Sequence, residues 1–396
     1  MNPLNQHNIK AGKLSLIGIF YISACAISYA TSVSQYSGTQ VYPGGFSVFD
    51  NKNDESAIII GGTAIATFTG YKLKGTGSNA PGLEFWGASL EFENGANIET
   101  SGANSHGFYL RTNPGGDIPG AVSLDSSTIA TSGAGAHAIY VENVASSLVA
   151  SNMTVTSTQG GFLSFSGTGT AGSSVNFTGG TVSVADTLIR ANNAGASNNA
   201  VTVILKDVST GWASGINLLD TQNSVINLTV DNVARFDGNL IADAGSRVAV
   251  TLKNSTDFLG TITGDSINLS LNGALWMVSG NSTLGQLSLA EAYNSVSLHD
   301  GVRLKFSDSS NILWSNNVLF NNVIDSVSVQ FGSDGLALTQ DQLSRITVID
   351  AVTGLEWSQV GINENGFLYQ IPEPSSYAIF AGIIMLGLAT SSRRRK

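Results

Sequence analysis

The sequence is poor in cysteine, proline and charge. Its 396 residues include 1 Cys and 7 Pro, and charged residues make up 12% of the chain, about half of the ~25% that is usual in soluble domains. The single cysteine excludes an intramolecular disulfide. The other two shortages exclude a Pro-rich linker, a coiled coil and an acidic disordered tail. The class that remains is a β-rich chain whose polar positions are filled by Ser, Thr and Asn, with 45 Gly for its turns.

Basic residues are scarce and unevenly placed. The chain has 18 Lys and Arg against 28 Asp and Glu, for a formal net charge of −10. Lys10 and Lys13 lie near the start, and four more basic residues end the sequence, so the body between them is more acidic than the whole chain. An acidic body repels phosphate backbones, and we expect no nucleic-acid partner. The alternative explanation of this negative charge is that it only keeps the protein soluble.

Residues 1–30 have the three parts of a secretory signal peptide. Lys10 and Lys13 form the positive region, and an apolar run extends from Leu14 to Ile27. Ser28 and Ala30 then place small residues at the −3 and −1 positions that signal peptidase requires. We therefore expect export by the general secretion machinery, with cleavage after Ala30.

Cys25 provides an alternative processing site. The segment Ile22-Ser23-Ala24-Cys25 resembles a lipobox, in which the cysteine is acylated and becomes the mature N-terminus. The other interpretation is a small residue within the apolar run. A lipid-anchored surface protein is thus a second hypothesis.

The C-terminus has its own three-part pattern in residues 372–396. Pro372-Glu373-Pro374 precedes an apolar run from Tyr377 to Ala389, and Arg393, Arg394, Arg395 and Lys396 follow. As a helix, residues 375–392 would measure roughly 27 Å, just enough for a hydrocarbon core of about 30 Å. The basic residues would stay cytoplasmic, and the two prolines would keep the tripeptide extended.

This tail resembles the PEP-CTERM sorting signal that exosortases recognise. The resemblance implies a single C-terminal membrane helix, a pause in the inner membrane and processing near Pro372-Glu373-Pro374. It also implies an exosortase as partner and a Gram-negative bacterium that makes exopolysaccharide. The alternative is an ordinary tail anchor.

Short strand-like runs and internal repeats organise residues 31–301. Ile98-Glu99-Thr100-Ser101-Gly102-Ala103 and Phe108-Tyr109-Leu110 recur, 31 residues later, as Ile129-Ala130-Thr131-Ser132-Gly133-Ala134 and Ile139-Tyr140-Val141. Val248-x-Val250-x-Leu252 recurs as Ile267-x-Leu269-x-Leu271. Repeats of about 20–30 residues with two or three short strands predict the coils of a parallel β-helix. At roughly 22–25 residues per coil, residues 55–300 would form about ten coils, each rising about 4.8 Å, and make a rod near 50 Å long.

The region around Trp276 and Gly280-Asn281-Ser282-Thr283-Leu284 resembles the last coils of pertactin-like autotransporter passengers. That resemblance implies a right-handed β-helix. Too few residues follow it for a β-barrel translocator.

Residues 302–371 are predicted to form a small C-terminal capping module. Thr339 and Gln342 have the spacing of a capping box, which indicates a short helix. Such a module would cover the strand edges and core at the end of the solenoid.

Candidate chemistry is sparse. Acidic residues are densest in two segments. We interpret residues 50–55 as a solvated turn and Glu91-Phe92-Glu93 as an exposed strand face. His106 and His137 occupy equivalent repeat positions and would stack about 5 Å apart, but a metal site needs a third ligand that the sequence does not offer. His299 is expected in a loop. We predict no catalytic residue, metal or cofactor.

These patterns predict an exported structural or adhesive protein rather than an enzyme. It would pass through an inner-membrane intermediate to the cell surface or the extracellular matrix, where exopolysaccharide is an expected partner. A polysaccharide-active β-helix enzyme is the alternative, and it would require acids from distant coils to converge.

Overall fold

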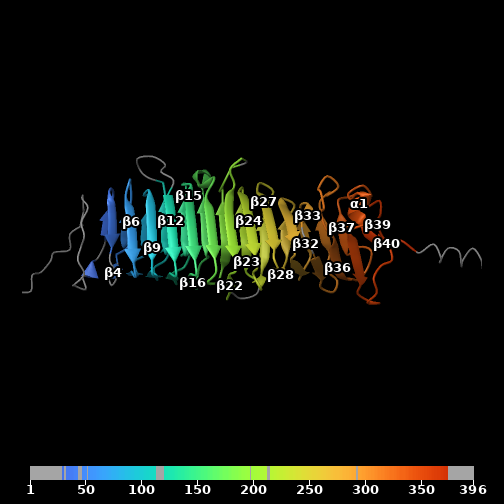
Figure 1. Cartoon of the computed structure of the whole chain (residues 1–396), viewed down its shortest axis with the longest axis horizontal. Coiled ribbons are helices and arrows are strands. Elements are labelled where there is room, and N and C mark those ends of the chain that lie inside the picture. Colours follow the sequence, from blue (N-terminus) through green and yellow to red (C-terminus); the bar gives the residue numbers. More distant parts are fainter. Residues whose placement is uncertain are drawn as a thin grey trace, which may run out of the picture.

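The structure, a computed structural model, describes residues 29–30, 33–42, 47–50, 52–112, 120–196, 198–211, 215–290 and 293–372. Figure 1 shows one elongated stack of short strands. Each complete coil supplies one strand to each of three faces, and neighbouring coils pair in parallel. The prediction of an all-β parallel solenoid is confirmed.

Face I holds an eight-stranded sheet and, at the same place in later coils, a six-stranded one. Ile98 lies opposite Ile129, and Thr100 lies opposite Thr131, as the 31-residue repeat predicted. Its strands are β1 (Tyr29–Ala30), β4 (Ser47–Asp50), β7 (Lys72–Gly75), β10 (Asn97–Thr100), β13 (Thr128–Thr131), β16 (Thr154–Ser157), β19 (Thr181–Val184) and β22 (Ser209–Thr210), then β25 (Phe236–Asp237), β28 (Asp257–Gly260), β31 (Leu275–Val278), β34 (Asn294–Leu298), β36 (Val318–Val323) and β38 (Ile346–Asp350).

Face II is a thirteen-stranded sheet. Tyr109 lies opposite Tyr140 in it, again in the register of the repeat. Its strands are β2 (Val33–Gln35), β5 (Ile58–Ile60), β8 (Leu83–Phe85), β11 (Phe108–Arg111), β14 (Ile139–Glu142), β17 (Leu163–Ser166), β20 (Thr187–Asn192), β23 (Asn217–Gln222), β26 (Asn239–Ala242), β29 (Ile262–Gly264), β32 (Ser282–Leu284), β35 (Leu304–Phe306) and β37 (Val329–Phe331).

Face III is an eleven-stranded sheet. Val250 lies opposite Leu269, and Leu252 lies opposite Leu271, which confirms the second repeat. Its strands are β3 (Thr39–Tyr42), β6 (Ile65–Thr69), β9 (Ser89–Glu93), β12 (Gly120–Asp125), β15 (Ser146–Ser151), β18 (Ser174–Thr178), β21 (Val201–Lys206), β24 (Val225–Asp231), β27 (Arg247–Lys253), β30 (Ile267–Asn272) and β33 (Leu287–Ala290). A single 3₁₀ turn, η1 (Thr168–Thr170), lies between β17 and β18.

The whole solenoid has about 12 turns, whereas the ten expected were for residues 55–300 alone. Coils vary in length: equivalent residues lie 31 apart at His106 and His137, but only 18 apart at Asn268 and Gln286. The parallel stacking also runs beyond residue 301, because β36 pairs with β34 and β38 pairs with β36. This continuation and the first coil, β1 to β3, add turns that lie outside residues 55–300.

The core is a column of apolar side chains that alternate with outward-facing ones along each strand. Aromatic rings stack from coil to coil within it, as at Phe68 and Phe92, whose ring centroids lie 4.9 Å apart. Trp276 is fully buried, and its Nε1–H donates to the carbonyl oxygen of Gly260 at 3.1 Å. Each coil buries little by itself, so this stacking supplies most of the hydrophobic stabilisation.

The corner between faces III and I is formed by a column of left-handed residues. Asn152 illustrates the geometry: its φ is 53°, and its N–H donates to Thr178 of the next coil at 2.9 Å. Small polar residues and glycine tolerate this conformation best. The column comprises Asn94, Ser126, Asn152, Gly179, Asp207, Asn232 and Asn254.

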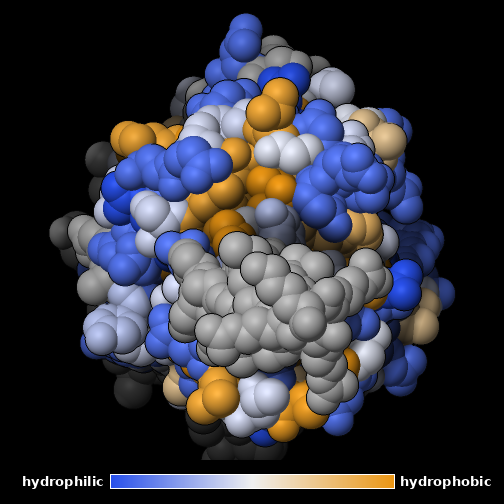
Figure 2. Space-filling model, turned by 90° about the vertical axis from the view of Figure 1, so that its right-hand side faces the viewer, coloured by the Kyte–Doolittle hydropathy of each residue, from blue (hydrophilic) through white to orange (hydrophobic). Residues whose placement is uncertain are grey.

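The C-terminal end is closed by α1 (Gln340–Leu343) and a two-stranded antiparallel sheet, β39 (Val360–Ile362) and β40 (Leu368–Gln370). The predicted capping box is present, because Gln342 N–H donates to Thr339 Oγ1 and Gln342 Oε1 accepts from Thr339 N–H. The buried Gln342 amide also donates to Ser309 and Ile312, which fixes α1 on the coil below it. Figure 2, viewed onto this end, shows hydrophobic side chains near its centre within a mostly hydrophilic outline.

In the part of the chain that the structure describes, no helix has the length and apolar character needed to cross a bilayer. The membrane helix predicted within residues 375–392 lies outside the described residues.

Candidate functional site

The residues predicted for export and sorting lie at the edges of the described structure. Pro372 is exposed just beyond β40, whereas Glu373, Pro374 and Arg393 to Arg395 are outside the described residues, as are Cys25 and Ser28. Ala30 belongs to β1, which pairs with Ser47 and Val48 of β4. Cleavage after Ala30 would therefore remove the first strand of face I.

The two repeated histidines are stacked as predicted. The rings of His106 and His137 lie 5.5 Å apart at an angle of 11°. The backbone N–H of His137 donates to Nδ1 of His106 at 3.0 Å, and the N–H of Gly161 donates to Nδ1 of His137 at 3.2 Å. Each imidazole thus links its coil to the next one. His299, by contrast, is exposed after the end of β34.

Burial keeps both histidines neutral. It lowers the pKa of His106 to about 3, with a smaller contribution from His137. It lowers the pKa of His137 to about 4, with a further contribution from the positive charge of Arg190. A desolvated imidazole disfavours the charged form, and each Nδ1 already accepts a backbone hydrogen bond. Both side chains are therefore structural acceptors at neutral pH.

Two tyrosines extend this stack onto the outer surface of face II. Tyr109 and Tyr140 are half-buried, and their rings lie 5.4 Å apart at 30°. The Tyr140 ring also stacks on His106, with centroids 4.5 Å apart. The Tyr109 hydroxyl donates to the carboxylate of Glu142, and burial, with that hydrogen bond, raises the pKa of Tyr109 above its usual value. Tyr109 is therefore protonated under all physiological conditions.

A buried carboxylate and an arginine complete the surface. Glu84 is 7% exposed; it accepts a hydrogen bond from Ser56 Oγ at 2.6 Å and forms an ion pair with Arg111. The Arg111 guanidinium lies 4.9 Å from the Trp86 ring centroid and 5.8 Å from that of Tyr109. At these distances the guanidinium is attracted to the faces of both rings by cation–π interactions. We call this group of residues the face II cluster: Glu84, Trp86, His106, Tyr109, Arg111, His137, Tyr140 and Glu142.

The geometry of the face II cluster favours stacking over acid–base chemistry. Its two carboxylates are each engaged, Glu84 with Arg111 and Glu142 with Tyr109. Among the described residues, no group of three or more His, Cys, Asp or Glu side chains is placed to hold a metal ion. The cluster therefore presents aromatic rings beside one ion pair and one hydrogen-bonded carboxylate.

The sequence located only part of this cluster. His106 and His137 were singled out, and Tyr109 and Tyr140 appeared in the repeat but were not recognised as a surface feature. Glu84, Trp86 and Arg111 were missed, because only the register that places Tyr109 opposite Glu84 brings them together. The available signal was a tyrosine at the outward position of both repeated triplets.

No family model matches the chain, and searches of curated proteins and of solved structures also found no match.

Proposed function

We propose that this chain is an exported structural or adhesive protein of a Gram-negative cell surface or extracellular matrix, and that the face II cluster binds a neutral exopolysaccharide. The body is a right-handed parallel β-helix, the hand that strand crossovers strongly favour. An exosortase-type system sorts the chain through Pro372-Glu373-Pro374 and the membrane helix behind them. The observation that supports binding is the outward-facing aromatic stack of Tyr109 and Tyr140 in consecutive coils.

A neutral polysaccharide fits this surface for two reasons. Aromatic side chains combine a broad apolar face with a polar edge, which suits a sugar ring that has an apolar C–H face and peripheral hydroxyls. Glu84 is neutralised by Arg111, and the remaining carboxylate, Glu142, accepts a hydrogen bond from the neutral Tyr109, so the cluster presents hydrogen-bonding atoms and no positive charge in excess for a polyanion. An acidic chain of net charge −10 repels polyanionic polymers.

Binding is favoured over hydrolysis or elimination by the state of the polar groups. A general base must be within reach of a substrate proton and must have a pKa near the working pH. Tyr109 has a raised pKa, and the ring nitrogens of His106 and His137 that face the next coil accept backbone hydrogen bonds. We therefore propose that the cluster is not an active site.

Affinity electrophoresis in gels that contain a neutral polysaccharide, hydroxyethyl cellulose, tests this proposal. We expect the mature chain to be retarded, and Tyr109→Ser with Tyr140→Ser to weaken retardation at least fivefold, about 1 kcal/mol. Val149→Ser, a change at an exposed residue of face III, is the matched control. Free migration of the wild-type chain would contradict the proposal. Release of new reducing ends or unsaturated sugars by the protein would favour the enzyme alternative.

The lipid-anchored alternative has one observation in its favour. Processing at Cys25 keeps Tyr29 and Ala30 in the mature chain, where they form β1 against β4. Cleavage after Ala30 would remove this strand. The mass of the mature N-terminal peptide distinguishes the two: an acylated Cys25 supports the lipid anchor, and an N-terminal Thr31 excludes it.

A further inference from the structure

Tyr293 stands at a position where neighbouring coils use small residues. The register of β28, β31 and β34 places Asp257 opposite Leu275 and Leu275 opposite Ser295. Two residues earlier in each coil are Ser255, Gly273 and Tyr293, all left-handed, with φ of 64°, 71° and 48°. Serine and glycine suit this corner, whereas a bulky side chain is disfavoured in the left-handed region.

The tyrosine ring packs so little against the rest of the fold that burial does not offset the strain of the left-handed backbone. The residue is 94% exposed, the highest value among the exposed large hydrophobic residues in the described part of the chain. A residue held in a disfavoured conformation without packing suggests a role outside the fold. Asn, which occupies the same corner at Asn232 and Asn254, would be the expected structural choice.

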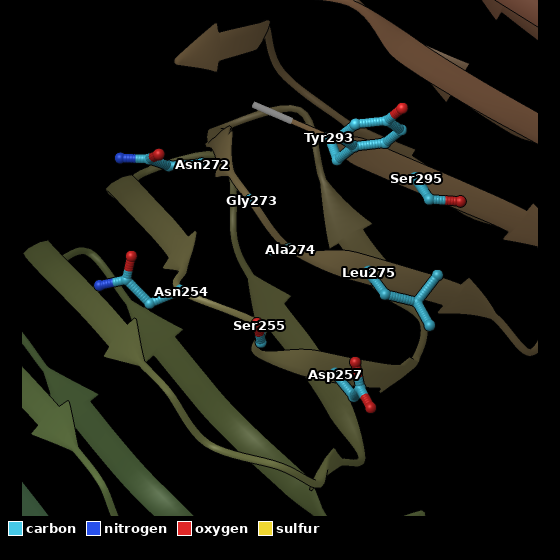
Figure 3. Close-up of a pocket in the computed structure, with 9 residues that line it drawn as sticks. All are labelled: Asn254, Ser255, Asp257, Asn272, Gly273, Ala274, Leu275, Tyr293 and Ser295. Atoms are coloured by element: carbon cyan, nitrogen blue, oxygen red, sulfur yellow. The ribbon is translucent and has the colours of Figure 1, made fainter. Parts of the chain in front are cut away.

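An open groove lies beside Tyr293, and its lining has mixed chemistry. Figure 3 shows Leu275 below the tyrosine, with Ser295 on one side and the Asp257 carboxylate further down the same column of face I. Asp257, Leu275 and Ser295 are all half-buried and point outward. The groove therefore offers one exposed aromatic ring, one apolar floor residue, a carboxylate acceptor and a hydroxyl.

We infer that Tyr293 and Leu275 form a second binding site for a pyranose ring of a neutral polysaccharide, with Asp257 and Ser295 bonding its hydroxyls. A small number of polar groups around an apolar contact is the usual composition of such sites. This inference rests on the proposed function and adds a site on a different face of the rod. The face II cluster and this groove lie in different coils and on different faces, so the two sites do not overlap.

The decisive variant is Tyr293→Asn, because a structural role and a binding role predict opposite results for it. Asn relieves the left-handed strain, so we expect the Tm to rise by about 2 °C. Loss of the ring should raise the apparent dissociation constant for hydroxyethyl cellulose at least threefold. Ser126→Asn makes the same kind of change at an exposed corner residue with φ of 49°. It should not weaken binding.

The effect of Tyr293→Asn is measured both in the wild-type chain and in the chain that carries Tyr109→Ser and Tyr140→Ser. In the second background, we expect it to abolish the retardation that remains. Unchanged retardation by Tyr293→Asn in both backgrounds, with a wild-type chain that binds, would overturn this site and leave the proposed function standing. A wild-type chain that migrates freely would overturn both. A fall in Tm for Tyr293→Asn would show that the ring stabilises the fold, and would contradict the strain from which the binding role of Tyr293 is inferred.

Discussion

The imidazole of His106 accepts a hydrogen bond from the backbone N–H of His137 at 3.0 Å, and the two residues are separated by one 31-residue coil. A side chain thus accepts here a coil-to-coil hydrogen bond of the kind that carbonyl oxygens accept along the strands. This bond requires a neutral Nδ1, so it links the stability of the solenoid to pH.

We expect the chain to lose stability as the pH falls below 6.5. The folded pKa values are about 3 for His106 and about 4 for His137, while an unfolded histidine titrates near 6.5. The unfolded state therefore binds more protons below pH 6.5, and the stabilisation present above that pH is lost on acidification. The loss at pH 4.5 should be about 1 to 3 kcal/mol per histidine.

Urea unfolding between pH 7.5 and pH 4.5 measures this effect. His106→Asn is the informative variant, since its amide oxygen can still accept the N–H of His137 but does not titrate. The variant should show a shallower pH dependence than the wild-type chain. Equal slopes would mean that carboxylates elsewhere account for the acid sensitivity.

The tight approach of successive coils predicts opposite outcomes for two nearby glycines. A Cβ added at Gly77 would lie 1.7 Å from the carbonyl oxygen of Lys52, whereas one at Gly75 would meet nothing closer than 3.5 Å. Gly77→Ala must therefore move backbone and should cost about 2–4 kcal/mol. Gly75→Ala should be neutral or slightly stabilising, because Ala loses less backbone entropy than Gly. Thermal unfolding of both variants provides the comparison, and equal Tm values would contradict the coil spacing described above.

The ion pair within the face II cluster predicts a second stability difference. Arg111→Ala would leave the buried Glu84 carboxylate without its cation, and half-exposure of the arginine moderates the cost to about 1–3 kcal/mol. Lys52→Ala removes the cation of an exposed pair with Glu55 and should cost less than about 1 kcal/mol. The measurement is the urea midpoint of each variant. A Lys52 variant as destabilised as the Arg111 variant would argue against a special role for Glu84.

The basic end of the chain is expected to control retention. Lys and Arg side chains resist translocation, so we expect Arg393, Arg394, Arg395 and Lys396 to hold the tail on the cytoplasmic side. Deleting these four residues should let the tail pass through the membrane, so that the full-length protein escapes into the medium. Cell fractionation followed by immunoblotting detects this. Retention of the truncated chain in the inner membrane would show that the apolar run alone is sufficient.

The fold was predictable because core side chains at equivalent positions of consecutive coils pack against one another and are therefore similar. Ile98 and Ile129, or Leu252 and Leu271, face the same core from consecutive coils, and their repetition is visible in the sequence. The number of coils was harder to predict from the sequence, because the loops at the corners change length without disturbing the core. The face II cluster was the hardest to predict. Its outward residues are free to differ from coil to coil, so Trp86 and Arg111 show no repeat although they are in contact.

The most direct test of the account is the size and location of the protein in cells with and without the exosortase. With the enzyme, we predict a mature chain cut near Pro372-Glu373-Pro374 and found at the surface or in the matrix. Without it, or with Glu373→Ala, the exported chain should accumulate uncut in the inner membrane, because the N-terminal signal is unchanged. Full-length protein of the same size and location in both strains would contradict the account and identify the tail as a plain membrane anchor.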